Sequence, residues 1–264
     1  MSLCLHFQLT LFSDSPAALS KKVAGRVARP ANDFRTAKLW LDICRSTHDI
    51  CRLQTTKNMR PTRLLDLQDH NILRIVAGET SHGEYATLSH CWGSKIIVQL
   101  TEASADQFAS NIPWDLFSKT FQDAILIARG LNIPYLWIDS LCIIQDNPGD
   151  WERESASMAR IYAQAAVNIA CCASSDGEGG CFQSRLEPND YVEIKDTENE
   201  NGTIKIGPFL GFGEAVARSP LLSRGWVVQE RLLSRRKLYY AKNQLYWHCS
   251  QTYMSECQNQ FADL

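Results

Sequence analysis

The segment between residues 135 and 146, Tyr135-Leu-Trp-Ile-Asp139-Ser-Leu-Cys142-Ile-Ile-Gln145-Asp146, is a near-continuous apolar run with a carboxylate, Asp139, inside it. Runs of this kind are typical of a parallel strand that is buried on both faces. A buried carboxylate without a partner is unfavourable by several kcal/mol unless it becomes neutral, so Asp139 requires a partner or a chemical role. Ligands bind at the carboxyl ends of strands in open α/β sheets, and we therefore expect function here first.

Helix and strand patterns alternate on both sides of this segment. In chain order they predict a helix over 36–52, edge strands near 60–66 and 72–76, a strand over 85–89, a helix from 120 to 130, a helix over 151–165, a strand over 166–173, a polar hairpin over 191–206, a short helix over 226–233 and a hairpin over 237–249. The alternation predicts an α/β fold with a mainly parallel central sheet flanked by helices, and an antiparallel hairpin late in the chain.

Composition narrows the class of protein. The 264 residues are 45% hydrophobic and carry a formal charge of −2, so a sizeable core is expected and neither nucleic acid nor membrane binding is favoured. No apolar run approaches the roughly 18 residues of a membrane span, and the N-terminal segment lacks the positive region of a signal peptide. The ten cysteines are scattered through apolar stretches rather than arranged as a disulfide framework, which favours a reducing, cytoplasmic setting.

Three potential metal ligands share one face of the first predicted helix. Cys44, His48 and Cys51 are spaced i, i+4, i+7. A closed zinc site requires a fourth ligand, and no second close-spaced Cys/His pair offers one. The sequence therefore favours buried thiols and one hydrogen-bonded histidine, and we predict no metal.

The sequence leaves alternative roles open for several other reactive side chains. Glu154 lies in the apolar stripe of the helix over 151–165, where it is either a site residue or the partner of a buried arginine. A thiol protease using Cys142 with His90 or His248 is a disfavoured alternative, and the adjacent His90 and Cys91 face opposite sides of an extended chain. The sequence contains no GxGxxG, P-loop or Gly-x-Ser-x-Gly motif.

Three blocks together resemble the HET (heterokaryon incompatibility) domain of filamentous fungi. They are Tyr85-Ala-Thr-Leu-Ser-His-Cys-Trp-Gly93, the run from Leu116 to Tyr162 with Asp150-Trp-Glu-Arg-Glu154, and Arg224-Gly-Trp-Val-Val-Gln-Glu230. The resemblance covers roughly residues 36–250, with small departures at Asn111 and Ile144. It implies an irregular lead-in over 1–35, a HET domain over 36–250 with its core at 85–233, and a polar tail over 251–264.

The resemblance implies a role in fungal non-self recognition and programmed cell death. It also implies a remote similarity to TIR domains, some of which cleave NAD, and hence a TIR- or flavodoxin-like sheet. The catalytic glutamate of TIR enzymes lies in a Ser-x-Trp-Cys-x-x-Glu context, and the corresponding stretch here runs from Ser223 through Trp226 to Glu230. NAD is then a substrate, and no prosthetic group is expected.

A site follows from this similarity. Glu230 would stabilise the oxocarbenium-like transition state, and Asp139 would orient it or bind the ribose. The expected NAD-contacting residues are Ser89, Trp92 and Gly93 on a closing loop, Trp226 as a stacking wall, Arg224 or Arg231 at the pyrophosphate, and Glu154. The alternative is a module without chemistry that signals by self-association. Its partners would be copies of itself and an upstream non-self recognition protein, without nucleic acid or membrane.

Overall fold

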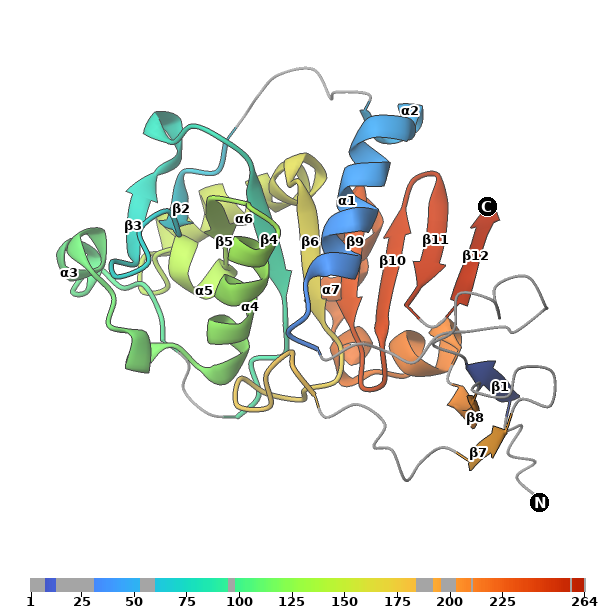
Figure 1. Cartoon of the computed structure of the whole chain (residues 1–264). Helices are drawn as coiled ribbons and strands as arrows, with labels where there is room; N and C mark the ends of the chain where they lie inside the picture. The colour runs from blue at the N-terminus through green and yellow to red at the C-terminus, as the bar shows by residue number, and fades with distance from the viewer. Residues whose placement is uncertain are drawn as a thin grey trace.

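A computed structural model describes residues 8–12, 31–52, 60–94, 98–183, 192–195, 203–209, 211–256 and 258–263. For residues 8–12, 192–195, 203–209 and 258–263 and for Trp226 it describes the backbone alone. Its strands are β1 (Gln8–Phe12), β2 (Arg63–Asp66), β3 (Arg74–Ala77), β4 (Tyr85–Ser89), β5 (Tyr135–Trp137), β6 (Val167–Cys171), β7 (Val192–Lys195), β8 (Thr203–Phe209), β9 (Arg236–Tyr240), β10 (Leu245–Cys249), β11 (Thr252–Ser255) and β12 (Gln258–Asp263). Its α-helices are α1 (Arg35–Thr47), α2 (Asp49–Arg52), α3 (Ala105–Ser110), α4 (Lys119–Gly130), α5 (Asp139–Cys142), α6 (Pro148–Gln164) and α7 (Gly225–Leu233). Figure 1 shows one large twisted sheet with a small second sheet beside it.

The large sheet is mixed rather than mainly parallel. Its strand order is β12-β11-β10-β9-β6-β4-β5-β2-β3, and only the three pairs within β9-β6-β4-β5 are parallel. The five outer pairs are antiparallel. The prediction of a mainly parallel sheet is therefore wrong, because antiparallel strands extend a short parallel centre on both sides. The predicted antiparallel hairpin late in the chain is confirmed as β9 and β10. One of these extensions, β11 and β12, lies in the stretch that the sequence described only as a polar tail.

Most predicted elements are present. The strand over 85–89 and the helices over 151–165 and 226–233 are confirmed, with starts that differ by up to three residues at α6. The helix over 36–52 breaks at His48, whose backbone is extended. Within the expected irregular lead-in, β1 pairs with β8 in the small sheet. The predicted strand from residue 135 ends at Trp137, and the chain turns into α5 at Asp139.

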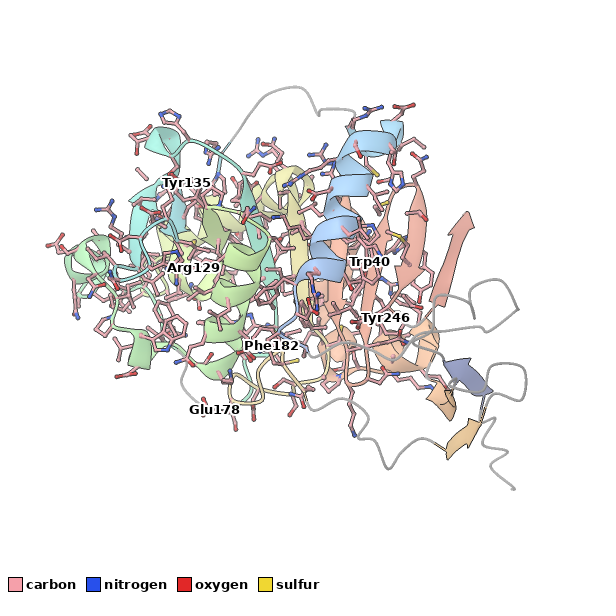
Figure 2. The ribbon with its side chains drawn as sticks, in the orientation of Figure 1. Trp40, Arg129, Tyr135, Glu178, Phe182 and Tyr246 are labelled. Atoms are coloured by element: carbon pink, nitrogen blue, oxygen red, sulfur yellow. The ribbon has the colours of Figure 1, made fainter. Side chains whose placement is uncertain are left out.

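Helices cover both faces of the sheet. In Figure 1, α1 and α4 lie on one face, with α6 and α7 on the other. Alternate residues of β4 and β6 divide accordingly, since Ala86, Leu88 and Ile169 join the core under α1 and α4. Figure 2 shows Trp40 of α1 and Arg129 of α4 on that side, where Arg129 donates to the carbonyls of Leu67 and Asp69.

The strand order reverses at β4. The chain leaves β4 through α4 to β5 on one side, then returns through α6 to β6 on the other side of β4. Such a reversal opens a crevice at the carboxyl ends of the strands, which is where open α/β sheets bind ligands. A site is expected where β4 and β5 end.

Candidate functional site

A cleft of about 240 Å³ lies at these strand ends. Its walls combine two carboxylates and one guanidinium with two indoles and several smaller side chains: Trp92, Asp139, Ile143, Gln145, Trp151, Ser155, Met158, Arg224 and Glu230. Trp92 follows β4, Asp139 follows β5, and Glu230 comes from α7. Ligand sites are usually partly apolar concavities in which a small number of polar groups converge.

Glu230 is held by a polar row under α7. Its carboxylate accepts a short hydrogen bond from the Ser89 hydroxyl at the end of β4, and its side chain is 6% exposed. Asn168 of β6 donates to the Ser89 oxygen at 3.0 Å, while its own carbonyl accepts from Thr87 at 3.1 Å. The Ser89 hydroxyl also lies 3.2 Å from the Asn168 side-chain oxygen, so Glu230 is held at the end of a connected polar row that runs from Thr87 through Asn168 and Ser89.

The surroundings raise the pKa of the Glu230 carboxyl toward neutral pH. Burial is the main cause that raises its pKa to about 7, the neighbouring Asp139 adds to the effect, and the Ser89 hydrogen bond and Arg224 oppose it. Carboxyls with pKa values near the working pH are common in active sites, where burial and a like charge produce them.

Asp139 is not inside a strand, as the sequence suggested, but directly after one. Its Oδ2 accepts from the Trp92 indole at 3.2 Å, and its Oδ1 accepts from the Ser140 amide at 2.8 Å. The bond from Trp92 links the loop after β4 to the end of β5. The anomalous carboxylate thus needs no buried partner, because it is half-buried at the cleft and hydrogen-bonded.

The loop after β4 is fixed from both sides. Arg224 donates a short hydrogen bond to the His90 carbonyl, and the buried His90 ring packs edge-on against Phe121 at 5.0 Å. Burial lowers the pKa of His90 to about 4, so the ring is neutral at physiological pH. Gly93 has a φ of 70°, and a Cβ there would overlap Asp176, so only glycine fits. Gly93 shapes the loop but does not line the cleft.

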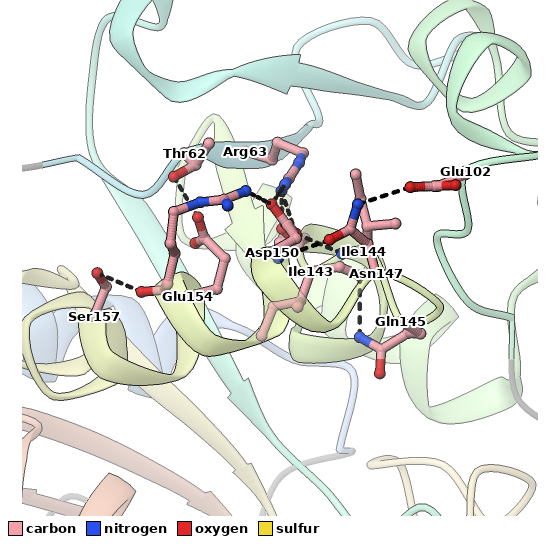
Figure 3. A network of polar contacts seen from close by, with 12 residues as sticks. Thr62, Arg63, Glu102, Ile143, Ile144, Gln145, Asn147, Asp150, Glu154 and Ser157 are labelled. Atoms are coloured by element: carbon pink, nitrogen blue, oxygen red, sulfur yellow. Dashed lines mark hydrogen bonds and ion pairs between the residues drawn. The ribbon is translucent and has the colours of Figure 1, made fainter.

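Glu154 lies elsewhere. Its carboxylate accepts from the Thr62 hydroxyl (Figure 3), and Glu154 is not among the residues that line the cleft. The buried acid on α6 that pairs with arginine is Asp150, which binds the half-buried Arg63 and the exposed Arg153. Burial alone would raise the pKa of Asp150, but the Ile144 amide and Arg63 lower it overall. This network anchors the start of α6 beneath the cleft.

One further predicted contact differs from expectation, and another stays untested. Arg231 lies over the Phe212 ring at 5.8 Å and lines a separate groove with Leu232, so it does not face Glu230. The side chain of Trp226 is outside the described part of the structure. The sequence prediction missed Trp151, Ser155 and Met158, although their i, i+4, i+7 spacing places them on one face of α6.

The cysteines fall into two groups. Burial raises the pKa of Cys142 to about 12, which makes this thiol unreactive and argues against a thiol protease. The prediction that Cys44, His48 and Cys51 lack a fourth ligand is wrong, because Cys249 of β10 lies beside them. The sequence could not show this neighbour, which is about 200 residues further along the chain.

Comparison with known proteins gives one result. The family model described as "Heterokaryon incompatibility protein (HET)" matches residues 85–230, from the first residue of β4 to Glu230. No curated protein and no solved structure matches the chain. Among the described residues, no helix is long and apolar enough to cross a membrane.

Proposed function

Because the chain belongs to the heterokaryon incompatibility (HET) family, we propose that its incompatibility-related function is enzymatic, namely hydrolysis of NAD to nicotinamide and ADP-ribose. The observation that carries this proposal is the pairing of Glu230 and Asp139 in one cleft, with Glu230 buried and held by Ser89. Two carboxylates flanking a sugar, with indoles close by, are a common arrangement for cleavage of a glycosidic bond.

The chemistry requires little acid catalysis. The bond between C1′ of the ribose and the pyridinium nitrogen breaks, and its electron pair neutralises nicotinamide, which leaves without a proton. Positive charge develops on the ribose ring, and an ionised Glu230 stabilises it from its largely buried position. Water then adds to C1′ and loses one proton, giving ADP-ribose.

The remaining groups suit the rest of the substrate. Trp92 and Trp151 offer aromatic surface for the nicotinamide ring. Arg224 forms no ion pair with any described carboxylate, so its charge is free to meet the pyrophosphate. A volume of about 240 Å³ is below the roughly 300–1,000 Å³ of sites that enclose drug-sized ligands, so the adenosine end would extend outside.

The test is nicotinamide release from NAD by the purified chain at the highest soluble concentration. We expect turnover by the natural chain and a loss on the order of 10²–10³-fold in Glu230→Gln. Glu154→Gln is the matched control, since it removes another buried carboxylate that accepts from a hydroxyl but lies outside the cleft. No turnover at any concentration, or full turnover in Glu230→Gln, would refute the proposal.

One observation favours the alternative of a self-associating signalling module. The face of α7 opposite Glu230 exposes Val228 and Leu232, the latter 76% exposed. An exposed leucine beside other apolar groups suits an interface between copies of the chain. If Leu232→Lys abolished a concentration-dependent dimer and cell death while Glu230→Gln left both intact, this module would replace the hydrolase.

A further inference from the structure

Four potential metal ligands meet on the face of the sheet opposite the cleft. Cys44 from α1, His48 at the break between α1 and α2, Cys51 from α2 and Cys249 from the end of β10 are all buried. Their ligand atoms lie within 4.8 Å of one another, and Cys249 Sγ is 3.3 Å from Nδ1 of His48. We propose that these residues bind one structural zinc ion.

The distances suit a single tetrahedral ion. With Zn–S near 2.3 Å and Zn–N near 2.0–2.1 Å, two sulfurs are about 3.8 Å apart and a sulfur and a nitrogen about 3.6 Å apart. The 3.3 Å between Cys249 Sγ and Nδ1 of His48 is close to the second value, and no two ligand atoms are more than 4.8 Å apart, so small side-chain shifts would complete the tetrahedron. Three thiolates and one imidazole are soft ligands that select zinc over magnesium or calcium. With four protein ligands and no open position, the site would be structural rather than catalytic.

A buried arginine supplies independent support. Arg236 is 7% exposed, and its Nε donates to Cys44 Sγ at 3.2 Å while its Nη2 donates to the Cys51 carbonyl at 2.9 Å. Among the described residues no carboxylate pairs with it, although a buried guanidinium ordinarily requires an anion. Binding of Zn²⁺ by three thiols and neutral His48 releases three protons and leaves a net charge of −1. Arg236 would balance this charge and hold the Cys44 thiolate, as outer partners of metal ligands do.

A bound zinc ion would explain why the first helix breaks at His48. His48 has a ψ of 100°, so the chain leaves α1 there and restarts as α2. The ion would tie both helices to β10, joining segments about 200 residues apart in the chain. The ligands lie outside the family-matched range of 85–230, so the site extends the fold beyond that range.

The first experiment measures zinc by elemental analysis in the full chain purified under reducing conditions from zinc-supplemented cells. After dialysis against a chelator of moderate strength, we expect about one zinc per chain. We expect at least a fivefold loss in Cys249→Ala and His48→Ala. Cys142→Ala is the matched control, because Cys142 is equally buried but away from the cluster, and it should keep its zinc.

A second measurement avoids variants that fail to fold. Natural chain freed of metal under reducing conditions is titrated with Co²⁺ alone, and a tetrahedral visible spectrum with a thiolate charge-transfer band is expected, both lost when Zn²⁺ is added. Absence of zinc together with absence of this band would overturn the proposal. Peptide mapping that found a disulfide among Cys44, Cys51 and Cys249 in the cytoplasmically expressed protein would also overturn it. Neither readout depends on NAD hydrolysis.

Discussion

Replacing Glu230 with glutamine should make the protein more stable at alkaline pH, even though it removes the proposed catalytic group. The folded-state pKa of Glu230 is raised from 4.5 to about 7, mainly by burial. A carboxyl that holds its proton more tightly when folded stabilises the native state at low pH. This contribution is fully present below the unfolded pKa and is lost as the pH rises through about 7.

The magnitude follows from the same values. At about 1.4 kcal/mol per pH unit, ionising Glu230 in the folded protein costs about 3 kcal/mol of stability at pH 8.5, and a smaller part of this is already lost at pH 5. The advantage of Glu230→Gln over the natural chain should therefore grow by about 2–3 kcal/mol between pH 5 and pH 8.5. His90, with its pKa lowered to about 4, favours folding as the pH rises from 4 to 6.5, but it is present in both proteins and cancels in the comparison.

The assay is urea unfolding followed by tryptophan fluorescence at several pH values, since the chain has seven tryptophans. Glu152→Gln serves as the control, because it removes a negative charge from the exposed side of α6. Parallel stability curves for the natural chain and Glu230→Gln across this pH range would show that burial does not raise the pKa of Glu230. The reasoning about the cleft would then fail at its first step.

Four other predictions concern the cleft, its loop and the cysteine cluster. The kcat/KM of NAD hydrolysis should rise with pH through about 7 and then level off, because the ionised form of Glu230 acts; a profile that falls across this range would contradict the role. Asp139→Asn should lower kcat/KM on the order of a hundredfold with unchanged circular dichroism. Gly93→Ala should reduce the free energy of unfolding in urea by roughly 2–4 kcal/mol, since it combines a positive φ with overlap onto Asp176; an unchanged midpoint would mean that the loop adjusts freely. A strong chelator should lower the melting temperature by at least about 5 °C in the natural chain but not in Cys249→Ala, as measured by calorimetry.

The sequence predicted local structure better than pairing. The strand over Tyr85–Ser89 and the apolar stripe of α6 depend on residues close together in the chain, and both elements were found. Which strands pair is decided by contacts far apart in the chain. The edge strands and the late hairpin were predicted, but the antiparallel pairing of β2 with β5 and the addition of β11 and β12 were missed. Asp139 was singled out correctly as anomalous, but for the wrong reason, because the strand ends before it.

The candidate site shows the same difference between what local sequence patterns predict and what depends on long-range contacts. Sequence similarity brought Glu230 forward, the apolar run from residue 135 brought Asp139 forward, and both line one cleft. Similarity could not exclude Glu154, because an acid in an apolar stripe finds its partner only in three dimensions, and that partner is Thr62. Cys249 was missed because a metal ligand that comes alone from a distant strand leaves no spacing pattern in the sequence.

The cleft and the proposed zinc site meet in the pairing of two parallel strands. Arg236, which binds Cys44, is the first residue of β9, and the next residue, Lys237, lies opposite Asn168 of β6. Asn168 donates to Ser89, and the Ser89 hydroxyl binds the Glu230 carboxylate. Two consecutive residues of β9, Arg236 and Lys237, therefore connect the cysteine cluster with the row of hydrogen bonds that holds Glu230. Ionised Glu230 destabilises the fold, whereas a bound ion stabilises it on the opposite face of the same strands. The register of β6 and β9 can then be maintained in spite of a charge that the proposed hydrolysis requires but the core disfavours.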